Sequence, residues 1–394
     1  MPNDRKTVAL INEGFGDNLG DKAISKCLLA MISLHSLVRL IPFSVHQSEK
    51  LQPVIADLTI YMLLRRFSRI IRPKAKARVR WWFLGGRKYY QKSLRKRLQG
   101  CDAVIVGGGQ LIKSNISLFA ERLDVVREEC NRIGIPYSMF GAGVDANIDL
   151  VCRDGVKRFF TEASHLCVRD HASRKTILSY GVSPSTVSLS PDVAFSQNVM
   201  CGVVKNSHER RRFGVNVMSY SVFRKNRPEN SLISHLQYLN FWAELVKLSN
   251  NECGSAVIFT TGASCDYSDA KYVKDIVMGI GVEVDLAHPK SLDSLNETLS
   301  SLSHSVVSRM HAGILGVASD TRCVALGWDE KVIGCWQTIG QAERVFSTSL
   351  LLDPSGPELV WNRLISDSAP INIDRISAEI RLGLDTCLTA MLGQ

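Results

Sequence analysis

Several features are missing from this 394-residue chain, and each absence excludes a class of protein. No apolar run approaches the roughly 18 residues that cross a bilayer, so no transmembrane helix is predicted. The apolar stretch Thr7–Ile11 is too short for a signal-peptide core and no cleavage site follows it, so we expect a cytoplasmic protein. No two of the 11 cysteines form a Cys-x-x-Cys pair, which argues against zinc and disulfides. We expect buried thiols, for example at Cys27, Cys101, Cys167 and Cys323.

Acidic residues are absent from one long segment. Between Arg65 and Arg97 the chain has fourteen Lys and Arg residues, interleaved with Trp, Phe and Tyr, and no Asp or Glu. No nucleic-acid-binding motif accompanies them, so no nucleic-acid partner is predicted. Basic residues mixed with Trp and Tyr are typical of a bilayer interface. The segment therefore predicts either peripheral contact with the anionic inner face of the cell membrane or an insertion whose basic side chains pack on the domain's own acids or are merely solvated.

The hydrophobic pattern alternates between strand-like and helix-like segments along the chain. This alternation predicts an α/β fold in which two doubly wound parallel sheets follow one another. We expect an N-terminal domain over 1–197, a linker over 198–212, a C-terminal domain over 213–373 and a terminal helix over 374–394. Strands are expected at 7–11, 38–42, 103–106, 135–140, 166–168 and 187–189, and then at 213–217, 256–260, 282–284, 305–307 and 321–326.

Glycine-rich or polar loops follow several of these strands, at the end where open α/β sheets bind ligands. The loop after the first strand has three glycines but matches neither a Rossmann fingerprint nor a P-loop. Asp21 is expected to cap the helix that follows. The loop is either a well-capped turn or a device that places Asn18 and Asp21 over a ligand. A later strand ends in Gly107–Gly109, which indicates close approach of a chain or a ligand.

The turn Ser308–His311 lies between a strand ending at Val307 and an expected helix over 312–318. Backbone N–H groups at a helix N-terminus favour an anion. Arg309 adds a guanidinium for a phosphate or carboxylate, and His311 adds an imidazole that titrates near neutral pH. The alternative is an ordinary turn with a solvated arginine and a capped histidine.

Seven landmarks, in this order between about Val8 and Lys331, resemble the polysaccharide pyruvyl transferase family. They are Asn18-x-Gly20-Asp21, Gly107-Gly108-Gly109, Gly141-x-Gly143-Val144, Val168-Arg169-Asp170 with Ser173, Ser190-Pro191-Asp192, Ser308-Arg309-Met310-His311-Ala312, and Trp328-Asp329-Glu330-Lys331. The Ser-Arg-x-His-Ala motif is the most specific of them. Met310 replaces the leucine common in the family, and Trp328 replaces a frequent tyrosine. Neither change removes the polar groups that carry the chemistry.

The resemblance implies a fold, a reaction and a set of site residues. The fold would be two Rossmann-like domains facing across a cleft, similar to the GT-B glycosyltransferases. The reaction would use phosphoenolpyruvate as donor, form a pyruvate ketal on a saccharide acceptor of a cell-surface polysaccharide or its lipid-linked precursor, and release phosphate, with no metal or cofactor. The expected catalytic residues are His311, Arg309 and Asp21. The expected donor contacts are Arg169, Ser308, Arg309, His311 and Lys331, and the acceptor contacts are Asn18, Asp21, Gly108 and Gly109.

Two other functions compete with this one. A GT-B glycosyltransferase would share the fold but needs a pocket for the base and ribose of a nucleotide sugar, which the sequence does not reveal. A non-catalytic, membrane-associated assembly factor would be expected to lose Arg309 or His311, and both are present. The sequence leaves open which sugar is modified, and whether the acceptor is lipid-linked or a nucleotide sugar.

Overall fold

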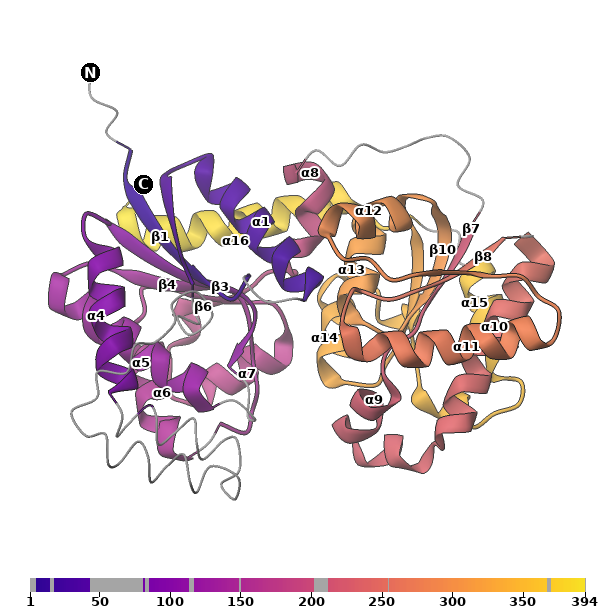
Figure 1. The fold of residues 1–394 in the computed structure, drawn as a ribbon. Coiled ribbons are helices and arrows are strands. Elements are labelled where there is room, and N and C mark those ends of the chain that lie inside the picture. The colour runs from indigo at the N-terminus through magenta and orange to yellow at the C-terminus, as the bar shows by residue number, and fades with distance from the viewer. Residues whose placement is uncertain are drawn as a thin grey trace.

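The computed structural model describes residues 5–14, 18–42, 81, 85–112, 117–148, 150–201, 212–253, 255–366 and 370–393. The greater part of the basic segment, residues 65–80 and 82–84, lies outside this set. The described residues form two α/β halves that lie side by side, each built on one six-stranded sheet flanked by helices (Figure 1). The predicted α/β class with two parallel sheets is therefore confirmed.

The N-terminal sheet is entirely parallel, with strand order β2-β1-β3-β4-β5-β6. Its strands are β1 (Thr7–Asn12), β2 (Leu37–Pro42), β3 (Ala103–Ile112), β4 (Tyr137–Val144), β5 (Leu166–Val168) and β6 (Val187–Leu189). Its main helices are α1 (Leu19–Ser33), α4 (Gly86–Leu98), α5 (Ser117–Ile133), α6 (Leu150–Glu162) and α7 (His171–Leu178). Helices cover both faces, which explains why strands such as β1 are continuous apolar runs. The chain reverses its direction of travel across the sheet between β1 and β3, so the topological switch point lies there.

The C-terminal sheet is also parallel, with strand order β12-β11-β10-β7-β8-β9 and a switch point between β7 and β10. Its strands are β7 (Arg212–Asn216), β8 (Ala256–Phe259), β9 (Asp285–Ala287), β10 (Leu302–Val307), β11 (Arg322–Leu326) and β12 (Val345–Phe346). Its main helices are α9 (Tyr220–Asn226), α10 (His235–Cys253), α11 (Tyr267–Gly279), α12 (Leu292–Ser300), α13 (Met310–Ala318), α14 (Glu330–Thr338) and α15 (Gly356–Ser366).

Two local expectations were wrong. The strand expected at 282–284 lies at Asp285–Ala287, where β9 pairs with β8. The first helix begins at Leu19, so its N-cap is Asn18 and not Asp21; the Asn18 side chain accepts a hydrogen bond from the Gly20 amide at 3.0 Å. Asp21 instead lies in the first turn, where a carboxylate also stabilises the helix dipole. The expected linker begins with a short helix, α8 (Gln197–Cys201), and residues 202–211 lie outside the described set.

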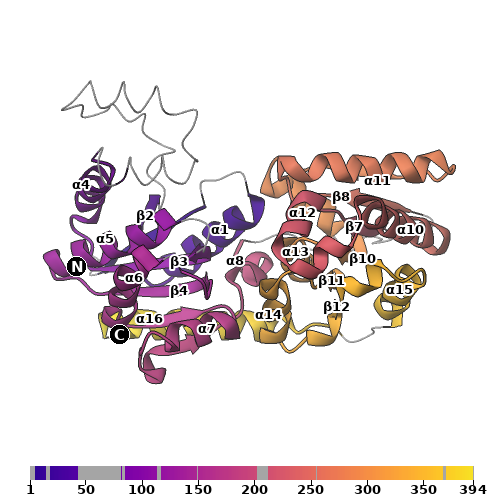
Figure 2. The same ribbon diagram turned by 90° about the horizontal axis from the view of Figure 1, so that it is seen from below.

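Helix α16 (Ile373–Leu392) joins the two halves from behind (Figure 1; Figure 2). Near its start, the Arg375 guanidinium donates to the Ile339 carbonyl at 3.2 Å. Further along, Gly383 lies so close to Ser190 and Cys167 of the N-terminal half that an added Cβ would be 3.0–3.1 Å from their side chains. One apolar core cluster runs through both halves as a result. The interface is therefore a packed one, which matters for a site built from both sides.

The described residues agree with two expectations drawn from composition. Within this part of the chain, no helix is long and apolar enough to cross a membrane. The structure describes the side chains of nine cysteines; all nine are free, and all except Cys265 are buried. The prediction of buried thiols is thus confirmed for eight of these nine cysteines.

The glycines that end β3 allow a stability prediction. Gly108 has a φ of +78°, and a Cβ on it would lie 2.1 Å from Ile24 of α1. Gly100 also has a positive φ, +70°, but open space around it. We expect Gly100→Ala to cost about 1–2 kcal/mol, the left-handed backbone penalty alone. Gly108→Ala should add about 1–3 kcal/mol of overpacking. Urea unfolding of both variants measures the difference, and equal midpoints would contradict the close packing of α1 on β3.

Candidate active site

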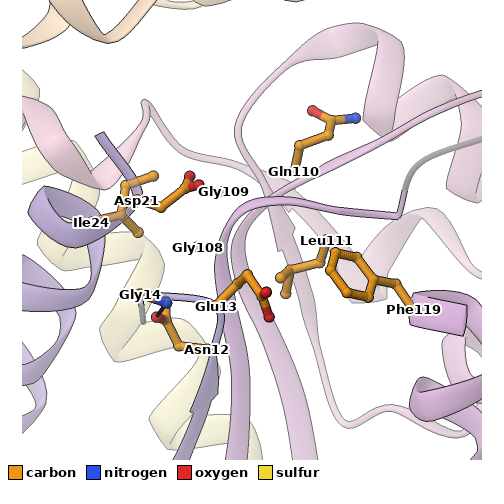
Figure 3. Close-up of a pocket in the computed structure, with 10 residues that line it drawn as sticks. All are labelled: Asn12, Glu13, Gly14, Asp21, Ile24, Gly108, Gly109, Gln110, Leu111 and Phe119. Carbon is orange, nitrogen blue, oxygen red and sulfur yellow. Dashed lines mark hydrogen bonds between the residues drawn. The ribbon is translucent and has the colours of Figure 1, made fainter. Parts of the chain in front are cut away.

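A pocket opens at the switch point of the N-terminal sheet, between the carboxyl ends of β1 and β3 (Figure 3). It is lined by Asn12, Glu13, Gly14, Asp21, Ile24, Gly108, Gly109, Gln110, Leu111 and Phe119. Because Gly108 and Gly109 have no side chains, the first turn of α1 lies directly on the end of β3. A Cβ on Gly109 would be 3.2 Å from Asp21 Oδ1. The triple glycine thus brings the Asp21 carboxylate over the strand end.

The pocket combines carboxylates and amides with one aromatic wall. In Figure 3 Asp21 lies beside α1, Gln110 lies across the bend of β3 from it, and Glu13 and Phe119 lie below that bend. Behind Phe119 the buried Arg122 guanidinium lies 5.5–5.9 Å from the ring centroids of Phe119, Tyr90 and Trp81. Burial lowers the pKa of Arg122, and the negative potential of the surrounding rings stabilises its charge. Glu13, Gln110 and Phe119 were not predicted from the sequence.

The turn after β10 lies at the switch point of the C-terminal sheet and is held by Asn216, at the end of β7. The Asn216 side chain accepts a hydrogen bond from the Arg309 amide at 2.9 Å, and Ser308 Oγ donates to the Asn216 carbonyl at 2.7 Å. Trp328 Nε1 donates to the Ser308 carbonyl at 2.6 Å. Ser308 is buried. Its contacts support the turn, and a contact to the donor stays a prediction.

Arg309 precedes the first turn of α13 and is already paired. Its Nε and Nη2 donate to the Asp266 carboxylate at 2.9 and 2.5 Å, and Asp266 is fully buried. Burial alone would lower the pKa of Arg309, but the hydrogen bonds and charge of Asp266 outweigh it and raise that pKa. Asp266 does not use Nη1. Arg309 is therefore a fixed cation with one edge available, and sequence analysis missed the carboxylate that orients it.

His311 lies in the first turn of α13 and faces the N-terminal half. A Cβ on Gly20 would lie 2.2 Å from His311 Nδ1, so the imidazole packs on the bare backbone of the first turn of α1. His311 Nε2 is buried without a hydrogen-bond partner among the described residues, and the nearest carboxylate, Asp192, is 4.0 Å away. Burial lowers the pKa of His311. The negative charges of Asp192 and Asp21 oppose this shift, whereas the positive charges of Arg169 and Lys331 add to it. The imidazole is therefore neutral at pH 7.

Arg169 follows β5 and is 2% exposed. Its Nη1 donates to Asp192 at 2.9 Å and its Nη2 to Gln110 Oε1 at 2.7 Å. Gly143 makes room for this arrangement, because a Cβ there would be 2.3 Å from Gln110 Oε1. The charge of Arg169 also lowers the pKa of His311, so the two side chains lie close enough for their charges to interact. Its expected contact with a donor anion stays a prediction.

Lys331 lies in the first turn of α14. Its Nζ is 2.8 Å from Asp329 and 5.4 Å from the ring centroid of Trp328, and its side chain is 37% exposed. Its positive charge lowers the pKa of His311 as well. Lys331 is thus an accessible cation on the side of the site that carries Arg309 and His311.

The structure brings the two groups of predicted residues together at the Gly20–His311 contact. One side carries the expected acceptor contacts, namely Asn18, Asp21, Gly108 and Gly109, and the other carries Ser308, Arg309, His311 and Lys331. The N-termini of α1 and α13 meet here, and helix N-termini favour anions. A neutral imidazole can accept a proton, and carboxylates with amides bind hydroxyl groups. No cluster of three metal-binding side chains occurs in the described part of the chain.

Comparisons with known proteins agree with this architecture. The sequence profile of a family described as "Polysaccharide pyruvyl transferase" matches residues 18–330. A comparison with curated protein sequences found no match. Among solved structures, UDP-GlcNAc 2-epimerase from Methanocaldococcus jannaschii is similar, with a TM-score of 0.56 and 10% identity over 96% of this chain and 99% of that one.

UDP-N-acetylglucosamine 2-epimerase from Rickettsia bellii is similar to the same degree. Its TM-score is 0.53 at 11% identity, over 98% of this chain and 96% of that one. At such low identity the likeness shows the fold alone. The fold is GT-B-like, with two Rossmann-like domains.

Burial of His311 predicts a pH dependence of stability. Its pKa is lower in the folded protein than in the unfolded chain. Below the ordinary histidine pKa of about 6.5 the unfolded chain therefore binds a proton that the folded protein does not, and stability falls as the pH falls. One such proton contributes up to about 1.4 kcal/mol per pH unit.

We expect His311→Gln to flatten the curve of unfolding free energy against pH between about pH 6.5 and 5, the range below the ordinary histidine pKa. The pKa values of His165, His288 and His304 are lowered too, so these residues contribute to the curves of both proteins. Only the difference between the wild-type and variant curves reports on His311. Parallel curves for the two proteins would mean that His311 is not buried in its neutral form.

Proposed function

The chain belongs to the polysaccharide pyruvyl transferase family, and we propose that it transfers the enolpyruvyl group of phosphoenolpyruvate to a saccharide, forms a pyruvate ketal and releases phosphate. The observation that carries this proposal is the contact between His311 and Gly20, where a neutral imidazole lies between two helix N-termini. Phosphoenolpyruvate is a small polyanion, and helix N-termini stabilise negative charge. The acceptor would be a sugar of a cell-surface polysaccharide or of its lipid-linked precursor.

The donor would bind on the C-terminal side of the contact. Arg309 offers the Nη1 edge that Asp266 leaves unused, and Lys331 offers a partly exposed ammonium group. The phosphate and the carboxylate of the donor each need such a cation. Arg169 would act from the N-terminal side as a buried positive charge. Ser308 would hold the turn that carries Arg309 and His311.

The acceptor would bind over the mouth of the pocket between β1 and β3, because the cavity itself, about 20 Å³, is too small for a sugar ring. The Asp21 and Glu13 carboxylates and the Gln110 amide are suited to sugar hydroxyls, and Phe119 is suited to an apolar sugar face. Asn18 would act through Asp21, because its side-chain amide donates to the Asp21 carboxylate at 2.8 Å. Gly108 and Gly109 would shape the pocket floor. Asp21 would be the base for one acceptor hydroxyl.

The reaction needs a group that both gives and takes protons. C3 of the enol gains a proton, which leaves C2 with oxocarbenium character. One sugar hydroxyl then adds to C2 and gives up its proton, phosphate leaves, and a second hydroxyl closes the ketal. His311 would supply the proton to C3 and receive one from a hydroxyl. Its imidazole is neutral in the free protein, so the polyanionic donor would favour the protonated form once bound.

The direct test is phosphate release from phosphoenolpyruvate with a panel of acceptor glycosides. We expect the wild type to release phosphate only with an acceptor, and to form a product heavier by one pyruvyl ketal. His311→Ala should lower turnover by at least about a hundredfold, because it removes acid–base catalysis. Donor affinity measured by calorimetry should stay within about tenfold of wild type, because the imidazole acts mainly on the transition state.

A parallel reaction with nucleotide sugars examines the competing glycosyltransferase function. Sugar transfer from a nucleotide sugar, without consumption of phosphoenolpyruvate, would replace the proposal. If His311→Ala turned over as fast as the wild type, the proposed reaction would stand but His311 would have no role in it.

We also propose that helix α4 contacts an anionic membrane surface. Two of its basic residues are paired with α5: Arg87 with Glu128 at 2.7 Å, and Arg95 with the buried Glu129 at 3.0 Å. These pairs fit the alternative in which the basic segment packs on the domain's own acids. Lys88, Lys92 and Lys96 differ, since they are exposed and lie four residues apart along one stripe of the helix. In both views α4 lies far from the C-terminal half (Figure 1; Figure 2).

Sedimentation with anionic vesicles tests this contact. We expect the wild type to pellet with the vesicles at low salt and to be released at high salt. Replacing Lys88, Lys92 and Lys96 with Gln should weaken binding by about tenfold or more, since each basic residue near the surface contributes about 1 kcal/mol.

The matched control replaces three exposed lysines that do not lie on α4, namely Lys157, Lys225 and Lys271, and removes the same charge. Equal loss of binding in both triple variants would indicate a general charge effect. Negligible pelleting of the wild type at either salt concentration would exclude the membrane contact.

A further inference from the structure

A chain of side-chain contacts crosses the carboxyl edge of the N-terminal sheet and ends at the other half's histidine. Asp145, after β4, accepts a hydrogen bond from Gln110 Nε2 of β3 at 2.6 Å. Gln110 Oε1 accepts one from Arg169, after β5, and Arg169 donates to Asp192, after β6. The last member, Asp192 Oδ2, lies 4.0 Å from His311 Nε2.

Asp192 is held rigidly in this position. Its side chain is 1% exposed, and its other oxygen, Oδ1, accepts a hydrogen bond from the Ala194 amide at 3.0 Å. That bond caps the short helix η3 (Val193–Ser196), which packs against α1, α13 and α16. Elements of both halves therefore fix where this carboxylate lies. Ser190-Pro191-Asp192 is one of the seven landmarks in the sequence, but no role was predicted for it.

The two nitrogens of His311 have different surroundings. Nδ1 lies against Gly20, the residue before Asp21, and Asp21 in turn lines the pocket between β1 and β3. Nε2 points into the protein, where it has no hydrogen-bond partner among the described residues. A buried nitrogen without a partner is unfavourable and uncommon. The nearest carboxylate oxygen is that of Asp192, about 1 Å beyond hydrogen-bond distance.

We propose that Asp192 is the positioning residue for His311: it receives the Nε2 hydrogen bond once substrates are bound, and so directs Nδ1 toward the acceptor. This inference rests on the proposed function. The hydrogen bond would fix the tautomer with the proton on Nε2, which leaves the Nδ1 lone pair to exchange protons with substrate. It would also stabilise the imidazolium that forms when Nδ1 takes a proton, as a base needs an orienting partner.

Four charged groups act on this imidazole. Asp192 and Asp21 favour its protonated form, whereas Arg169 and Lys331 disfavour it. Replacing Asp192 with Asn removes one of the two favourable charges and keeps one oxygen, which can accept either from the Ala194 amide or from Arg169. The pKa of His311 should therefore fall further in Asp192→Asn.

Asp170→Asn is the matched control. Asp170 is buried, caps α7 through the Ser173 amide at 2.7 Å, and lies 3.8 Å from the same Arg169 guanidinium. It is not among the charged groups that act on His311. Both variants thus remove a carboxylate charge next to Arg169, but only Asp192→Asn removes one that acts on His311.

We expect Asp192→Asn to lower kcat by about a hundredfold with little change in the KM of phosphoenolpyruvate, because the lost contact forms mainly in the transition state. The limb of the pH–rate profile that reports His311 should move to lower pH in Asp192→Asn and stay in place in Asp170→Asn. NMR of ¹⁵N-labelled histidine follows the tautomer and the titration of His311 directly. Wild type should show a proton on Nε2, and Asp192→Asn should titrate at lower pH.

The NMR result is independent of activity, so it separates this inference from the proposed function. An unchanged His311 titration and tautomer in Asp192→Asn would overturn the positioning role even if pyruvyl transfer is confirmed. Equal shifts in both variants would also overturn it, because the effect would then come from Arg169. If no pyruvyl transfer is found but the His311 titration moves as expected, the interaction between Asp192 and His311 is supported and the proposed reaction is not.

Discussion

The contact between the His311 imidazole and the backbone of Gly20 is the constraint on which the site depends. It joins the first turn of α13 to the first turn of α1, and any side chain at position 20 would occupy the space of the ring. Each of these turns lies at the switch point of its own sheet, where the strand order reverses. Two ligand-binding edges, one from each half, are thereby brought face to face. Because Gly20 has no side chain, the two crevices can meet and form one composite site.

The glycines of the N-terminal half serve the same purpose one layer further in. Gly108 and Gly109 let α1 settle on the end of β3, and Gly143 leaves room for the pair formed by Gln110 and Arg169. Close packing then holds polar groups where solvent would otherwise separate them. The price of this arrangement is burial of charge, and the two arginines next to His311 each have a carboxylate: Asp192 for Arg169 and Asp266 for Arg309.

The sequence predicted the order of the elements well but not the contacts between them. Alternating apolar and amphipathic segments identified most strands of both sheets, and strand-end motifs indicated Asn18, Asp21, Arg309 and His311 as candidates. Strand order and the approach of the two halves depend on tertiary packing, which local patterns do not encode. Asn216 and Asp266 were therefore missed, although they orient Ser308 and Arg309. The N-cap was misplaced by three residues because Asn18 and Asp21 are both good capping residues, and only the backbone distinguishes them.

Charge balance links this geometry to the proposed chemistry. The site has two neutralised arginine–carboxylate pairs around an imidazole that burial keeps neutral. A polyanionic donor that entered such a site would leave it with excess negative charge, held partly by Lys331 and the helix N-termini. The least costly compensation is a proton on His311, since Asp192 and Asp21 already favour that form. Donor binding and protonation of the imidazole are then coupled, so the protein would acquire its general acid only when the substrate that needs it is present.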